Sequence, residues 1–237
     1  MKKIFFLILI VLGVNNPSLR SEQVFAQTKD SNKILNAVKQ KFEKIHDYQA
    51  DVNIHVDVNF IKMADKKAKI YFKQPDKVKF QSEGFAMLPK QGINFSPSQL
   101  LKGNSSAIFV RTEDVDGKKL DVIKVVPKSD SGDVVLSTVW VDEANSVINK
   151  VETIGKRSGN ISMDFKYSTN QTLPDEVKFT FNFGGVQEQS NSRENDNNPA
   201  AMKQMGRGPL KGTATLTYTN YKINKGIPDS FFTEKKK

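Results

Sequence analysis

Apolar residues recur at every second position through most of the chain beyond residue 50. In the segment 51–60, Val52, Ile54 and Val56 alternate with charged and polar residues. Successive side chains of a β-strand point to opposite faces, so this period predicts strands with one buried and one solvated face. We therefore expect a sheet whose apolar side must be covered by something else.

Similar runs continue along the chain, at residues 68–72, 78–80, 107–110, 120–126, 134–141, 147–154, 161–167, 177–183 and 213–221. The connections between them are short and contain turn formers, for example Asp116-Gly117. Short connections join antiparallel neighbours, so the simplest topology is an up-and-down meander of about ten strands.

One segment near the N-terminus follows the helical period instead. Its apolar positions are spaced by one, three, four and three residues: Ile34, Leu35, Val38, Phe42 and Ile45. Asp30 and Ser31 precede it as candidate N-caps. The pattern predicts one amphipathic helix that packs on the sheet, because no other segment offers comparable helical length.

An apolar insertion at 84–103 interrupts the strand pattern. Ser96-Pro97 would start a short helix inside it. A long apolar excursion between strands has to cover part of the core or the mouth of a cavity, so the segment is a candidate lid. The alternative is an immobile cap on an open end of the sheet.

A second interruption, at 184–212, is rich in Gln, Asn, Ser and Gly. This composition predicts a flexible, solvated hairpin loop.

The N-terminus is typical of a signal peptide. Lys2 and Lys3 precede an apolar run over residues 4–14, which is too short to cross a bilayer as a helix. Val24 and Ala26 fit the small-residue rule for cleavage, which we expect after Ala26. The alternative is an uncleaved anchor. No later segment is long enough to span a membrane.

Cleavage would leave residues 27–237 as a single β domain. Three basic residues and one acidic residue leave with residues 1–26, so the net charge falls from +10 to +8. Export argues against nucleic acid as a partner, and the basic charge is compatible with an anionic surface or with solubility alone. There is no cysteine, hence no disulfide and no acylation site of a bacterial lipoprotein.

The residue types of catalytic and metal sites are poorly represented. The two histidines, His46 and His55, have no third ligand at a suitable spacing for zinc. There is no Gly-x-Ser-x-Gly motif, and the paired carboxylates fall at turns. The sequence therefore predicts no catalytic residue, no metal and no cofactor.

The remaining feature is apolar surface. One helix of about 15 residues spans about 22 Å, whereas ten strands at about 4.8 Å spacing are much wider. Either the sheet curls on itself or a groove is left for a ligand. A closed, fully packed barrel is the alternative.

Two stretches resemble the LolA-like periplasmic lipoprotein carriers: Tyr71-Phe72-Lys73-Gln74-Pro75-Asp76-Lys77-Val78-Lys79, and the closing segment from Tyr221 with its Asn224-x-x-Ile227-Pro228 pattern. A Tyr48-Gln49-Ala50 entry to the first strand adds to them. The resemblance implies a mainly β (α+β) fold: an incomplete antiparallel barrel of about 10–11 strands, wrapped over one long N-terminal helix and a short lid helix. This sequence departs from the carriers in lacking an arginine between residues 51 and 83.

The resemblance and the apolar surface together predict a periplasmic carrier or chaperone that transports acyl chains of lipoproteins or lipids toward the outer membrane. Sorting partners at the inner and outer membranes would serve it. The alternative is an envelope protein-interaction or stress-sensing module without lipid transfer. The candidate groove and lid residues are Phe80, Phe85, Leu88, Phe95, Leu100, Phe109 and Phe181, and the candidate headgroup contacts are Lys77 and Lys79.

Overall fold

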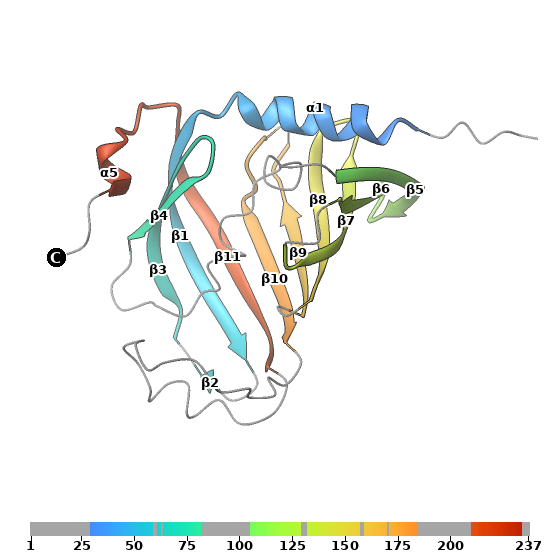
Figure 1. Ribbon diagram of the computed structural model, residues 1–237. Coiled ribbons are helices and arrows are strands. Elements are labelled where there is room, and N and C mark those ends of the chain that lie inside the picture. Colours follow the sequence, from blue (N-terminus) through green and yellow to red (C-terminus); the bar gives the residue numbers. More distant parts are fainter. Residues whose placement is uncertain are drawn as a thin grey trace, which may run out of the picture.

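The structure is a computed structural model that describes residues 29–58, 61–62, 64–81, 105–128, 132–156, 159–169, 171–183 and 210–233. Within these residues it contains eleven strands and two short helices (Figure 1). The elements are α1 (Ser31–Glu43), β1 (Asp47–Val58), β2 (Ile61–Lys62), β3 (Lys66–Lys73), β4 (Lys77–Gln81), β5 (Ser105–Val115), β6 (Lys118–Pro127), β7 (Val134–Asp142), β8 (Val147–Gly155), β9 (Asn160–Lys166), β10 (Glu176–Phe183), β11 (Leu210–Ile223) and α5 (Ser230–Thr233).

Helix α1 confirms the predicted amphipathic helix and begins at the predicted cap. The Asp30 carboxylate accepts hydrogen bonds from the backbone N–H groups of Asn32 and Lys33, at 3.0 and 3.1 Å. These bonds satisfy two donors that have no partner inside the helix. The apolar stripe is buried, and α1 lies across one end of the sheet (Figure 1).

All strands are antiparallel, and the order across the sheet is β4-β3-β1-β11-β10-β9-β8-β7-β6-β5, with β2 paired to β1. The meander prediction is correct from β5 to β11, where chain neighbours are also sheet neighbours. It is wrong for β1, which lies between β3 and the last strand. The first and last long strands therefore lie side by side in the interior of the sheet, and β4 and β5 are its edges.

The sheet is open rather than closed. Figure 1 shows it curving, with β5, β6 and the start of β7 turned out of the plane of the central strands. The predicted segment 84–103, with its lid helix, lies outside the described residues. Of the predicted loop 184–212, the last three residues, Leu210 to Gly212, belong to β11. No described helix is long and apolar enough to cross a membrane.

The two faces of the sheet have different chemistry, as the period of two predicted. One face carries the buried apolar side chains, including Ile54, Val139 and Leu216, each at most 1% exposed. We call it the inner face. The other face carries the polar residues at the alternate positions, such as Asn53, Thr138 and Thr217, and we call it the outer face. The main buried cluster extends across the sheet from β3 to β6 and includes Ile34, Leu35 and Val38 of α1.

Gly212 is required by close packing at the junction of β1, β10 and β11. A Cβ added there would lie 2.7 Å from the Asp57 carbonyl oxygen, 2.8 Å from Val58 Cγ2 and 2.9 Å from Phe181 Cζ. One of these contacts is backbone, so the strands would have to separate.

We expect Gly212→Ala to lower the free energy of unfolding by about 1–3 kcal/mol, because overpacking a close strand contact strains the pairing. Gly132→Ala is the matched control, since a Cβ there meets nothing within 4 Å. Urea unfolding monitored by circular dichroism measures both variants. Equal stability of the two would show that the close approach relaxes without cost.

Candidate functional site

The apolar inner face is most accessible at its two edges. Phe80 on β4 pairs with Ile70, and Phe109 on β5 pairs with Ile123. Ile70 and Ile123 are 1% and 0% exposed, whereas both phenylalanines are only partly buried and pack against the core from outside. Exposure on this face therefore increases from the central strands to the two edges of the open sheet.

Phe181, the third predicted contact that the structure describes, lies deeper on the same face. It is 8% exposed and stands on β10, in register with Gly212 of β11. Its ring lies against that glycine, so that Cζ occupies space that a Cβ on residue 212 would need. The three described aromatic candidates thus share the inner face, two at its edges and one within it.

The other four predicted contacts are Phe85, Leu88, Phe95 and Leu100, which lie outside the described residues. Their part in a binding site stays a prediction.

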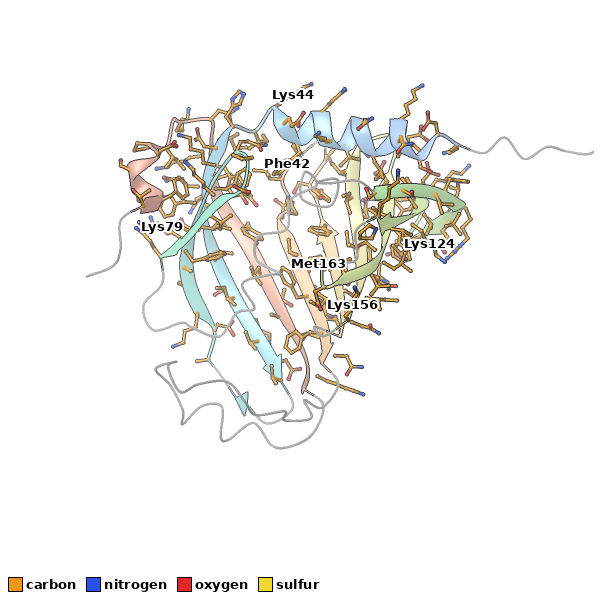
Figure 2. The ribbon with its side chains drawn as sticks, viewed as in Figure 1. Phe42, Lys44, Lys79, Lys124, Lys156 and Met163 are labelled. Carbon is orange, nitrogen blue, oxygen red and sulfur yellow. The ribbon has the colours of Figure 1, made fainter. Side chains whose placement is uncertain are left out.

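Aromatic side chains fill the end of the inner face that lies next to α1. Phe42 of the helix is 5.5 Å from Phe72, and Tyr48 is 5.1 Å from Phe72 and 5.7 Å from Tyr221, measured between ring centroids. The Tyr221 hydroxyl donates to the Pro174 carbonyl at 2.7 Å. Figure 2 shows Phe42 beneath the helix. We call these four packed rings, Phe42, Tyr48, Phe72 and Tyr221, the aromatic floor.

Lys77 and Lys79, the predicted headgroup contacts, are bound to the C-terminal segment. The Lys77 ammonium lies 2.9 Å from the Asp229 carboxylate, which also pairs with Lys73 at 2.6 Å. Lys79 donates to the Phe231 carbonyl oxygen and lies 4.3 Å from the centroid of that ring. Hydrogen bonds from Lys73 and Lys77 lower the pKa of Asp229 to about 2. Contact of these lysines with a lipid headgroup stays a prediction.

Sequence reasoning missed the junction that ties the C-terminus to the start of β1. The Asn224 side chain accepts from the His46 N–H at 2.7 Å and donates to the Lys44 carbonyl at 2.9 Å. In return, the buried Asp47 carboxylate accepts from the N–H groups of Lys225 and Gly226. Asn224 has a positive φ of 54°, a conformation that asparagine tolerates better than most residues. The only signal was an Asn-x-Gly sequence within the resemblance.

A second polar junction holds the chain before α1. The Lys29 ammonium donates to both carboxylate oxygens of Asp121, at 2.9 and 2.7 Å, and to Glu143 at 2.7 Å. Thr112 donates to the same Asp121 carboxylate at 2.7 Å. Burial alone would raise the pKa of Asp121, but the hydrogen bonds from Lys29 and Thr112 outweigh it and hold that pKa below its usual range.

We expect this junction to stabilise the protein most at neutral pH. Because the folded-state pKa of Asp121 is lowered, its contribution is complete above the unfolded-state pKa of about 3.9 and is lost as the pH falls through the lower folded-state value. Asp121→Asn should therefore be less stable than the wild type at pH 7, with a difference that shrinks in acid. Thermal unfolding at pH 7 and pH 3 tests this, and a gap that widens at pH 3 would contradict it.

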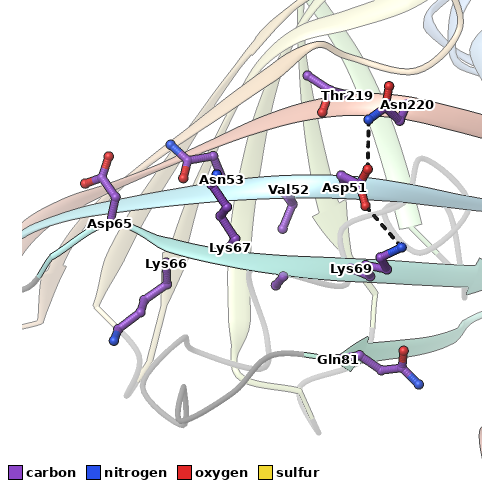
Figure 3. Close-up of a pocket in the computed structure, with 11 residues that line it drawn as sticks. Asp51, Val52, Asn53, Asp65, Lys66, Lys67, Lys69, Gln81, Thr219 and Asn220 are labelled. Atoms are coloured by element: carbon purple, nitrogen blue, oxygen red, sulfur yellow. Dashed lines mark hydrogen bonds and ion pairs between the residues drawn. The ribbon is translucent and has the colours of Figure 1, made fainter.

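A cavity of about 910 Å³ lies against the outer face of β1, β3 and β11 (Figure 3). Asp51 receives a hydrogen bond from Asn220 at 2.8 Å and lies 3.6 Å from the Lys69 ammonium. The hydrogen bond from Asn220 and the charge of Lys69 lower the pKa of Asp51. The lining also includes Asn53, Asp65, Lys66, Lys67 and Gln81. Charged side chains of both signs thus surround the cavity, and Val52 and Ala68 also line it.

Within the part of the chain that the structure describes, no three His, Cys, Asp or Glu side chains are grouped to hold a metal ion. The described chemistry is therefore that of an apolar surface with polar junctions at its ends.

The comparison with known proteins rests on structure. No protein-family model matches the chain, and no curated protein matches it by sequence. A LolA superfamily protein from Nitrosomonas europaea matches with a TM-score of 0.52 and 15% identity, over 87% of this chain and 98% of that one. The chain has a LolA-like fold. The fold that this resemblance implied is thus confirmed, as an open antiparallel sheet.

Two further structures match this chain over most of its length. A candidate outer membrane lipoprotein-sorting protein domain from Vibrio parahaemolyticus has a TM-score of 0.54 and 10% identity, over 86% of this chain and 97% of that one. A DUF1329 family protein from Desulfovibrio piger has a TM-score of 0.56 and 10% identity, over 86% and 98%. Identities this low concern the fold and transfer no residue role.

Proposed function

We propose that this protein is a periplasmic carrier that shields acyl chains of lipids or lipoproteins on the inner face of its sheet. The observation that carries the proposal is the change in exposure across that face. The central strands bury their apolar side chains, whereas Phe80 and Phe109 at the two edges are partly exposed. A chain of methylenes would enter between these edges and replace water there.

Binding of an acyl chain needs no covalent step, because burial of its methylenes provides the free energy. Each methylene removed from water contributes about 0.8 kcal/mol, so a segment of about ten methylenes yields about 8 kcal/mol before the ordering cost is subtracted. The aromatic floor next to α1 is held by rings and by the Tyr221 hydroxyl bond, so little of it has to be ordered on binding. Because about 8 kcal/mol corresponds to a Kd of about 1 μM before any cost, ten methylenes set an upper bound on affinity, and a longer acyl chain is needed to reach the micromolar range.

The LolA-like fold supports the carrier role through the name of one related structure, the candidate lipoprotein-sorting domain. The predicted signal peptide supports export, and the lack of cysteine supports a mature protein that carries no acyl chains of its own. We further propose that no catalysis is involved, in keeping with a sequence that offers no nucleophile elbow or metal set.

The test starts with protein purified from the cell envelope without detergent. Native mass spectrometry with lipid extraction shows whether acyl species are bound, and titration of delipidated protein with a fluorescent fatty acid measures affinity. Bound acyl lipid and saturable binding are the expected results. A clean protein that binds no fatty acid, with a copurifying envelope protein, would favour an interaction module instead.

A further inference from the structure

The outer face of the strands from β5 to β8 is unusually apolar. Among the described residues, eight large apolar side chains are strongly exposed, and seven of them lie on these four strands. Of those on the outer face, the most exposed are Ile108 at 55% and Ile154 at 45%, and Val135, at 46%, lies at the irregularity of β7 between Val134 and Leu136. Single exposed apolar residues are ordinary, but a group on one surface marks an interaction site.

The strand register makes the group contiguous. Leu136 of β7 pairs directly with Ile154 of β8. The pairing of Val125 with Ser137 places Val126 opposite Leu136 on the next pair of positions. Ile108 lies diagonally from Val126 across β5 and β6, within reach of a side-chain contact. We call these four residues, Ile108, Val126, Leu136 and Ile154, the outer apolar row.

The charge beside the outer apolar row is positive. Lys124 of β6 pairs with Ile108 of β5 on one side and with Thr138 of β7 on the other. Lys128 directly follows β6. Neither forms an ion pair with a described residue, and Figure 2 shows Lys124 on β6. The neighbouring acid Glu152 is neutralised by Lys150 at 2.6 Å. The row thus combines three exposed apolar side chains and the half-buried Leu136 with ammonium groups that pair with no described residue.

We propose that the outer apolar row and its lysines dock the protein on the surface of a bilayer that contains anionic lipid. Apolar side chains would enter the interfacial region while lysines contact phosphate groups, each worth about 1 kcal/mol near such a surface. A second copy of this chain fits less well, because Lys124 and Lys128 would meet the same lysines of the partner.

Trp140 supplies a probe at the border of this surface. It is the single tryptophan of the sequence and lies four residues beyond Leu136 on the same face of β7. Its indole N–H donates to Glu113 at 2.8 Å, and the Lys150 ammonium lies 4.9 Å from the ring centroid. Four residues of strand correspond to about 13 Å, so the fluorescence of Trp140 should respond to a membrane at the row.

The inference deepens the proposed function, because a carrier collects and releases its cargo at membranes, but it rests on a different face of the sheet. Phe109 and Ile108 are neighbours in sequence and lie on opposite faces of β5. The two hypotheses can therefore fail separately. Loss of fatty-acid binding with intact membrane docking would contradict only the carrier hypothesis. Loss of docking with intact fatty-acid binding would contradict only the docking hypothesis.

The experiment uses the mature protein with vesicles of phosphatidylethanolamine containing 30% phosphatidylglycerol, as co-sedimentation and as quenching of Trp140 by brominated lipid. We expect binding that weakens in high salt and is absent with pure phosphatidylcholine. Ile154→Asp should weaken it about tenfold or more, since burial of one isoleucine contributes about 1.5–3 kcal/mol. Thr217→Asp, on the outer face of β11, is the matched control for added charge.

Three results would overturn the proposal. The first is no binding to phosphatidylglycerol vesicles. The second is equal weakening by Ile154→Asp and Thr217→Asp, which would assign the effect to charge alone. The third is a dimer in analytical ultracentrifugation that Ile154→Asp dissociates, which would make the row an interface between copies of the chain.

Discussion

Phe109→Asp should lower the affinity for a fluorescent fatty acid at least about tenfold while the protein stays folded. Phe109 is partly buried at the edge of the inner face, where an aspartate would place a carboxylate against the acyl chain. Burying an ionised group without a partner costs several kcal/mol, and about 1.4 kcal/mol is a tenfold change in affinity. Titration of delipidated protein measures the effect.

Ile108→Asp is the control for this variant. It introduces the same charge one residue away on the outer face of the same strand, where the side chain is 55% exposed. It should leave fatty-acid affinity unchanged, and thermal unfolding of both variants shows whether either loses structure. Phe109→Leu should retain most of the affinity because it remains apolar. Unchanged affinity in Phe109→Asp would place the acyl chain elsewhere.

Asn224→Ala should be among the most destabilising single substitutions outside the core. Alanine would lose the bonds to His46 and Lys44 and would be held at a φ of 54°, a strained conformation for a residue with a Cβ. Orphaned backbone groups cost about 1–3 kcal/mol each, so we expect a loss of about 3 kcal/mol. For a chain of this size the melting temperature should fall by roughly 10 °C.

Asn220→Ala separates the two causes of that loss. Asn220 has the same φ of 54° but makes one exposed side-chain hydrogen bond, to Asp51. Its replacement should cost about 1 kcal/mol from backbone strain. Differential scanning calorimetry of the two variants then gives the value of the Asn224 hydrogen bonds by difference. Equal melting temperatures would mean that the hydrogen bonds between the C-terminal segment and β1 add nothing.

Alternation along single strands could be predicted from the sequence because it depends on neighbouring residues only. Val52 and Ile54 lie on the inner face for the same reason that Asp51 and Asn53 do not. The turn at Asp116-Gly117 was equally local, and both residues have positive φ values, 52° and 76°. Local chemistry thus supplied the strands and the helix.

Strand order could not be predicted in the same way. Nothing in the period of β1 indicates that its partners are β3 and β11, because the backbone hydrogen bonds that decide pairing are the same for every strand. The partners of charged residues could not be predicted either, because they lie far away along the chain. Lys77 and Lys79 looked like solvated or ligand-binding groups, whereas Asp229 and Phe231, about 150 positions away, are their partners.

The pairing of β1 with β11 also has a consequence for how the protein is made. Residues paired across these strands, from Tyr48 with Ile223 to Val58 with Gly212, are separated by nearly the whole folded domain. During synthesis the pairing of β1 has to wait for the last strand, and closing so long a loop makes folding slow. A chain still attached to the ribosome keeps β1 and β10 without their shared neighbour. Until β11 has been made, the edges of β1 and β10 that it will join stay open to pairing with another chain.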